Sequence, residues 1–218
     1  MAGEKGSSYA NSLLKLVFQA TGIANIADNT ATSPLTNLYV SLHTADPTAA
    51  GNQSSNEAIY STYSRATVAR TSGGFTVTSN SVSPAATVGF PACATIATTA
   101  ASGTGSAATI SWSTALPSAP AVGSNITVAG VTPAGYNGTF TVTSSTTTSV
   151  TYSNATSGAQ TVAGTILITP ASAASYFAVG TALTGAGVLL YAGPITPTVT
   201  ISSGVTPQLT TATAITEV

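Results

Sequence analysis

The sequence predicts an all-β protein: an antiparallel β-sandwich core, one N-terminal helix and a second, inserted β-sandwich. Two observations carry this prediction. Apolar and polar residues alternate with a period of two over many short runs, which is the pattern of half-buried strands. Glycine and proline separate those runs, as at Gly73-Gly74 and Gly193-Pro194, with the spacing expected of a sandwich or a barrel.

The one helical segment lies in residues 1–35, which we predict to form an N-terminal helix and docking arm. Ser7 or Ser8 can cap the start of the helix, and Gly22 is placed to end it. Apolar residues recur at spacings of three and four, at Tyr9, Leu13, Leu16, Val17 and Ala20. Leu14 and Phe18 widen this apolar face, so we expect it to be covered. Its own β-domain or a neighbouring subunit can do so, and both alternatives stay open.

Residues 36–94 and 167–218 are predicted to fold together as the β-sandwich core. The strand-like runs of these two pieces are LYVSLH, RATVAR, FTVTSNSVS, ATVGFPA, SYFAVGT, GVLLYAGPI, TVTIS and TAITEV. Arg65 and Arg70 begin and end the second run and are two of the four cations of the chain. They are either surface charges beside an edge strand or members of ion pairs across a subunit contact.

Residues 95–166 are predicted to form an inserted domain. The Ala/Thr/Gly/Ser-rich run at 97–108 has a composition that favours a flexible entry strand. Alternation resumes beyond it at Ile126/Val128, Phe140/Val142 and Val150/Tyr152. Asn137-Gly138 gives the strongest hairpin signal in the chain. Six or seven short strands in about 70 residues would form a small Ig-like sandwich, with Trp112 anchored in its core.

Ser41, His43 and Asp46 place the three residue types of a nucleophilic triad within the run LYVSLHTADP, and His43 is the only histidine. On a strand, Ser41 and His43 share a face with their Cα atoms ~7 Å apart. A serine and its base must approach to about 2.6–3.2 Å, usually from separate elements. Asp46-Pro47 is typical of a turn. We therefore predict no catalytic residue here, only a strand end with a polar histidine beside a turn.

Charge excludes several classes of function. Only 4% of the residues are charged, and none lies between Thr71 and Thr216, against about 25% in ordinary soluble domains. That stretch offers no carboxylate pair for acid–base catalysis and no basic patch for nucleic acid. No run approaches the ~20 apolar residues of a spanning helix, so we expect no membrane insertion. Low charge instead favours a permanent place in an assembly.

No motif indicates a cofactor or a metal. The glycine-containing turns GTGSAA and GAG lack the spacing and the lysine of phosphate-binding loops. Cys93 is the only cysteine, which excludes an internal disulfide and a cysteine-rich metal site. We predict that Cys93 is a small buried residue.

Five segments carry a family resemblance: LYVSLHTADP, NEAIYSTYSRATVART, FPA, YFAVGTALTGAGVLLYAGPI and ISSGVTPQL. They resemble a family of small tailed-bacteriophage virion proteins, generally labelled tail-fibre or minor structural proteins. The most specific segments are His43–Pro47 and Gly185–Gly193, and the match covers half of the chain. The run VGSNITVAGVTPAGYNGTFTVTSS looks like the Ig-like modules that phages insert into tail and capsid-surface proteins.

The resemblance implies a non-enzymatic structural subunit of the phage particle, in the form of a tail fibre or appendage component. A head decoration (cement) protein on the capsid surface is the alternative. A hydrolase acting on the bacterial surface is disfavoured, because the available acids sit in no recognisable motif. The expected partners are other virion proteins, further copies of the chain and, weakly, a host cell-surface glycan at an outward Ig-like domain. The predicted assembly interface comprises Tyr9, Leu13, Leu16, Val17, Arg65 and Arg70.

Overall fold

The structure is a computed structural model that describes residues 7–23 and 34–216; for residues 7–9 it describes the backbone alone. Antiparallel strands dominate it, and one helix precedes them. The strands form sandwich-like and half-barrel arrangements. The predicted all-β class with an N-terminal helix is therefore confirmed.

A four-stranded antiparallel sheet lies at the centre of the molecule, in the order β15-β14-β1-β2. Its strands are β1 (Asn37–His43), β2 (Ala66–Ala69), β14 (Ala174–Gly180) and β15 (Leu189–Val199). Val40 of β1 pairs with Val179 of β14, although the two lie far apart in the sequence. Both strands are buried over most of their length, since they occupy the middle of the sheet. This pairing brings the two sequence pieces of the core together.

Two smaller sheets also pair strands of the first piece of the core with strands of the second piece. One contains β3 (Phe75–Thr78), β4 (Ser81–Pro84) and β17 (Ile215–Thr216), and the other contains β5 (Val88–Gly89) and β16 (Gln208–Leu209). The run FTVTSNSVS, predicted as strand, is a hairpin. Ser79 takes a left-handed φ of 54° at its turn, followed by Asn80, a residue type that favours turns.

Helix α1 (Ser7–Gln19) packs on β3 and β4. Phe18 is buried and meets the ring of Phe75 edge-on, with 4.9 Å between the ring centroids. Of the two alternatives for the apolar face, the structure shows cover by the chain's own β-domain. The predicted stop at Gly22 is wrong, because Ala20 already takes a left-handed φ of 54° and Thr21 N–H bonds back to the Lys15 carbonyl.

Eight strands form a second sheet, in the order β12-β7-β8-β11-β10-β9-β13-β6. They are β6 (Ile96–Ala97), β7 (Ala100–Thr104), β8 (Ala107–Ser111), β9 (Asn125–Ala129), β10 (Gly138–Ser145), β11 (Ser149–Ser153), β12 (Ser157–Ala159) and β13 (Thr165–Thr169). The first half of β10 pairs with β9 and its second half with β11, with a register shift between Val142 and Ser144. A bulge of this kind bends a strand, so β10 connects the two halves of the sheet.

The run at 97–108, predicted as a flexible entry strand, forms most of the paired β7–β8 hairpin, which turns at Gly105 with a φ of 89°. Asn137-Gly138 does lie in the connection of two paired strands, with Gly138 as the first residue of β10 and opposite Val128 of β9. Its turn is longer than the predicted signal implies, because a 3-10 helix at Ala134–Tyr136 precedes it. The Asn137 side chain bonds the Val131 backbone through both its amide nitrogen and its oxygen.

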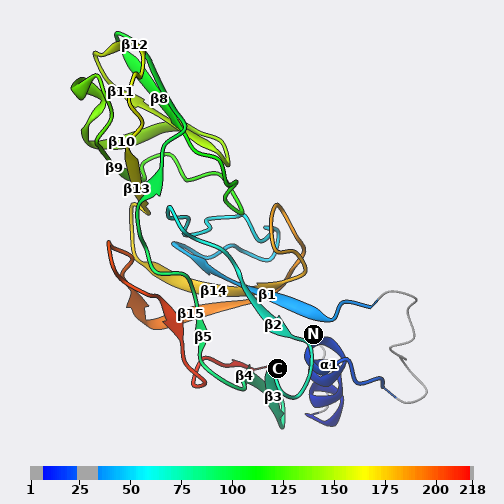
Figure 1. Cartoon of the computed structure of the whole chain (residues 1–218). Coiled ribbons are helices and arrows are strands. Elements are labelled where there is room, and N and C mark those ends of the chain that lie inside the picture. Colours follow the sequence, from blue (N-terminus) through cyan, green and yellow to red (C-terminus); the bar gives the residue numbers. More distant parts are fainter. Residues whose placement is uncertain (1–6, 24–33, 217–218) are drawn as a thin grey trace.

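Figure 1 shows an elongated arrangement. Strands β7 to β13 lie at one end, α1 with β3 and β4 lies at the other, and the four-stranded sheet lies between them. We call the part from residue 95 through β13 the insert. Strand β13 crosses the predicted boundary at residue 166, because its pairing with β9 continues to Thr169.

Candidate functional site

The Ser41 hydroxyl and the His43 ring are hydrogen-bonded, with 2.9 Å between Oγ and Nε2. The prediction that strand geometry keeps them apart is wrong, because the histidine side chain reaches back along its own face of β1. His43 Nδ1 lies 2.8 Å from the Ser55 carbonyl oxygen. A carbonyl only accepts, so Nδ1 carries the proton, and Nε2 accepts a hydrogen bond from the Ser41 hydroxyl.

This serine–histidine pair is closed to substrates. Ser41 and His43 are both 0% exposed. Neither residue lines any cavity found in the described part of the chain. Burial lowers the pKa of His43, since the charged form loses hydration. Asp46 belongs to the predicted turn and accepts a hydrogen bond of 2.8 Å from Thr48 N–H. The pair therefore connects β1 to the loop that carries Ser55.

A buried ion pair lies next to this loop. Arg65 donates from Nε and Nη2 to the two carboxylate oxygens of Glu57, each at 2.8 Å. Both side chains are at most 1% exposed. The guanidinium also donates to the carbonyls of Ala182 and Gly185, at 2.9 and 2.8 Å. The Ser118 hydroxyl of the insert donates to Glu57 Oε2, so this network joins both pieces of the core to the insert.

Two of the predicted interface residues are engaged within the chain. Arg65 is buried and paired with Glu57, so we remove it from the interface. Arg70 donates to the carbonyls of Leu16 and Val17 at the end of α1, where helix carbonyls lack intrahelical partners. Its guanidinium therefore caps α1 within the chain.

The other predicted interface residues lie on α1. Leu13 and Leu16 are half-buried and share one face of the helix. Val17 is also half-buried and packs partly against the core. Tyr9 lies outside the residues whose side chains the structure describes. The apolar stripe that remains partly open is thus formed by Leu13 and Leu16.

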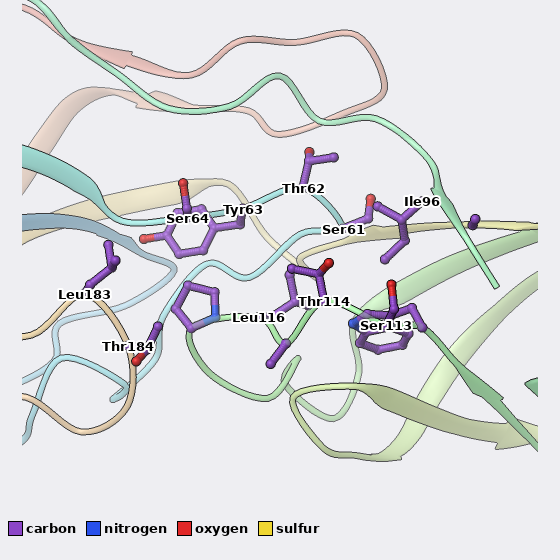
Figure 2. Close-up of a pocket in the computed structure, with 14 residues that line it drawn as sticks. Ser61, Thr62, Tyr63, Ser64, Ile96, Ser113, Thr114, Leu116, Leu183 and Thr184 are labelled. Atoms are coloured by element: carbon purple, nitrogen blue, oxygen red, sulfur yellow. The ribbon is translucent and has the colours of Figure 1, made fainter. Parts of the chain in front are cut away.

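A cleft of about 570 Å³ lies between the core and the insert (Figure 2). Leu183 and Thr184 lie on a core loop at one side of it, and Ser113 lies on the insert at the other. Its lining residues are Ser61, Thr62, Tyr63, Ser64, Ile96, Ala97, Trp112, Ser113, Thr114, Ala115, Leu116, Pro117, Leu183 and Thr184. No Asp, Glu, Lys, Arg or His is among them, so the cleft is uncharged.

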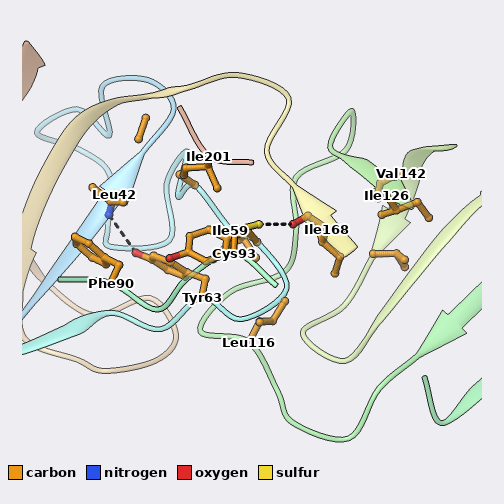
Figure 3. Close-up of a cluster of buried hydrophobic side chains, with 14 of the residues drawn as sticks. Leu42, Ile59, Tyr63, Phe90, Cys93, Leu116, Ile126, Val142, Ile168 and Ile201 are labelled. Carbon is orange, nitrogen blue, oxygen red and sulfur yellow. Dashed lines mark hydrogen bonds between the residues drawn. The ribbon is translucent and has the colours of Figure 1, made fainter. Parts of the chain in front are cut away.

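Ser61, which lines this cleft, holds the two ends of the insert together. Its hydroxyl donates to the Ala94 carbonyl at 2.5 Å and accepts from Ile168 N–H at 3.3 Å. Cys93 is buried and contacts the Ile168 carbonyl, as Figure 3 shows. Burial raises the pKa of the Cys93 thiol, so the neutral buried role predicted for this residue fits its surroundings.

Apolar packing continues from the core into the insert. Figure 3 shows Leu42, Phe90 and Ile201 on the core side and Ile126 and Val142 on the insert side. These five residues belong to one buried hydrophobic cluster. The insert is therefore seated on the core by apolar contacts as well as by hydrogen bonds.

Within residues 7–23 and 34–216 the structure groups no three His, Cys, Asp or Glu side chains that could hold a metal ion. The described helix is too short and too polar to cross a membrane. Comparison with family models, with curated proteins and with solved structures found no match to this chain. The fold and its buried networks define an all-β protein with an N-terminal helix and a firmly seated insert.

Proposed function

We propose that this protein is a non-enzymatic structural subunit of a tailed-bacteriophage virion, as a tail fibre or appendage component. The observation that carries the proposal is the separation of α1 and the insert at opposite ends of the molecule (Figure 1). A subunit of this shape can be held in a particle at one end and extend its other end outward.

The segments that resemble virion proteins support the proposal because they pack around one buried network. Arg65 comes from NEAIYSTYSRATVART and binds the Gly185 carbonyl, which begins the segment Gly185–Gly193. The turn that ends His43–Pro47 is held by the Asn56 amide, which donates to the Asp46 carbonyl at 2.9 Å. These segments thus form one structural unit of the core, outside the insert.

The charge distribution supports a permanent place in an assembly. No charged residue lies between Thr71 and Thr216, and Glu57 and Arg65 neutralise each other in the interior. The surface of the core and insert therefore lacks the like-charge repulsion that keeps proteins apart in solution. Copies of the chain arranged around a symmetry axis would gain from this absence.

We assign the anchoring contact to the α1 end. Leu13 and Leu16 leave a half-open apolar stripe there, and Lys15 adds one of the few charges of the chain, which can set the register against a partner. The insert then extends away from the particle. Its many threonine and serine side chains suit weak, many-copy adhesion to a host surface.

A variant of α1 tests this function. The Leu13→Ser/Leu16→Ser protein is expected to fold and to fail to enter phage particles, since Phe18 and Leu14 still hold α1 to the core. Val122→Ser is the matched control, because Val122 is a 70% exposed apolar residue at the insert end. Normal incorporation of the α1 variant would place the anchor elsewhere in the chain.

Imaging of intact particles separates the tail from the alternative of a capsid decoration protein. A tail component is expected in a small number of copies around the tail axis. A decoration protein would instead cover the capsid surface at many equivalent positions. Absence of the protein from purified particles would overturn both assignments.

A further inference from the structure

The wall of the cleft between core and insert contains Trp112, the single tryptophan of the chain. Trp112 is 4% exposed and lines the cleft, and its Nε1 has no hydrogen-bond partner among the described residues. A buried indole N–H normally finds an acceptor. This donor is unsatisfied among the described residues and its atom is closed to solvent, so a ligand in the cleft meets the apolar indole ring and not the N–H.

Hydrogen-bonding groups surround the cleft. Ser64, Ser113, Thr114 and Thr184 are exposed lining residues, and within the described part of the chain none of their hydroxyls makes a hydrogen bond. The hydroxyls of Ser61 and Thr62, by contrast, are engaged with backbone groups at the ends of the insert. The free hydroxyls lie on the core and on the insert, so a ligand between the two parts can meet both.

The walls of the cleft are apolar and uncharged. Leu116, Ile96, Leu183 and the Trp112 ring contribute apolar surface. The nearest guanidinium, that of Arg65, is fully engaged with Glu57 and with backbone carbonyls. A charged ligand would thus lose hydration without gaining a counter-charge.

We propose that this cleft binds a neutral saccharide, with the free serine and threonine hydroxyls as its hydrogen-bonding partners. A sugar ring offers hydroxyl groups at its rim and apolar C–H groups on its faces, which match the two kinds of lining. The volume of about 570 Å³ lies within the range of small-molecule sites and holds one or two sugar rings. The biological source of the saccharide, a host surface, rests on the proposed function.

An uncharged peptide fits the cleft less well. Recognition of an extended peptide by backbone pairing needs an exposed strand edge. The only strand in the described wall is β6, which has two residues, Ile96 and Ala97. The wall otherwise consists of loops whose side chains offer hydroxyl groups.

The single tryptophan of the chain makes a direct test possible. The full-length protein, labelled with ¹⁵N-tryptophan, gives one indole N–H resonance. The probes are glucose, galactose, mannose, N-acetylglucosamine, lactose, maltose and chitobiose, each titrated to ~50 mM, well above a millimolar Kd. Glucuronic acid and glucosamine serve as charged analogues. A saturable shift of the indole resonance is expected for at least one neutral probe, with weaker or no response to the charged analogues.

Hydroxyl-deleting variants locate the site. Ser113→Ala/Thr114→Val is expected to raise the Kd by roughly fivefold or more, since each neutral hydrogen bond contributes a few-fold. Thr141→Val is the matched control, because Thr141 is an exposed threonine of β10 outside the cleft.

Three results would overturn the proposal. They are the absence of a saturable shift with every neutral saccharide, equal affinity of the cleft variant and the control, and a stronger response to an uncharged Ala/Thr/Gly peptide. These measurements use the purified protein. If the protein enters particles but binds no saccharide, the proposed structural function stands and only the saccharide site is wrong.

Discussion

Arg65 and Glu57 form a bidentate ion pair, in which both N–O distances are 2.8 Å and both side chains are buried. Such geometry matches the planar guanidinium to the carboxylate. The remaining Arg65 donors meet the carbonyls of Ala182 and Gly185. Two distant pieces of the core are thereby joined at one point.

Removing one partner of this pair leaves an uncompensated buried charge. Glu57→Gln is expected to lower the free energy of unfolding by about 3–5 kcal/mol, measured by urea denaturation. Lys15→Ala is the control, because it removes a partly exposed charge from α1. A loss below ~1 kcal/mol for Glu57→Gln would mean that Arg65 finds other compensation.

The stability of the protein should depend on His43 between pH 7 and 5. Burial lowers the pKa of His43 in the folded state below 6.5, so on acidification the unfolded chain binds a proton first. The free energy of unfolding is therefore highest above pH 6.5 and falls as the pH decreases, by at most about 1.4 kcal/mol per pH unit.

His43→Gln isolates this effect, because His43 is the only histidine. The variant is expected to show a flat free energy of unfolding over the same pH range, in denaturation series at constant ionic strength. An identical slope in the variant and the natural protein would contradict the assignment.

The guanidinium of Arg70 should control the local stability of α1. Arg70→Ala removes the donors to the Leu16 and Val17 carbonyls and is expected to cost about 1 kcal/mol. Hydrogen exchange of the α1 amides should become faster, while exchange in β1 and β14 stays unchanged. Lys15→Ala serves as the cation control on the same helix. Equal protection of α1 in both variants would contradict the capping role.

Deletion of the insert tests its independence from the core. A chain that joins Cys93 to Pro170 through a Gly-Ser link is expected to fold, because Ser61 brings Ala94 and Ile168 together and closely placed chain ends tolerate such deletions. Its stability should be lower, since Glu57 loses the Ser118 hydroxyl and Leu116 no longer covers the core. Circular dichroism and thermal melting measure both. An unfolded product would show that core and insert fold only together.

The all-β class, the N-terminal helix and the alternation of buried residues could be predicted from the sequence, because they depend on local periodicity. Ile126 and Val128 are buried as their spacing predicts. The Asp46 turn also forms as predicted, since an aspartate side chain meets a backbone N–H two residues away. Each of these features requires only neighbours in the sequence.

The candidate sites depended on tertiary contacts. Trp112 was predicted to be buried, but no pattern indicated that its N–H would remain without a partner in a cleft shared with Leu183 and Thr184. The roles of Ser61 and Ser118 had no signal either, because a serine in a loop bonds whichever carbonyl or carboxylate the fold brings near it.

The sequence by itself determined where apolar and polar residues alternate and where the chain lacks charge. The long uncharged stretch in turn excludes the chemistries that need charged side chains. The tertiary structure alone decided that Arg65 is an internal partner of Glu57 and that Arg70 caps α1. It also decided that Ser41 and His43 meet in the interior. The physical reason is that a charged or polar side chain takes its role from the groups that replace water around it, and those groups come from distant segments.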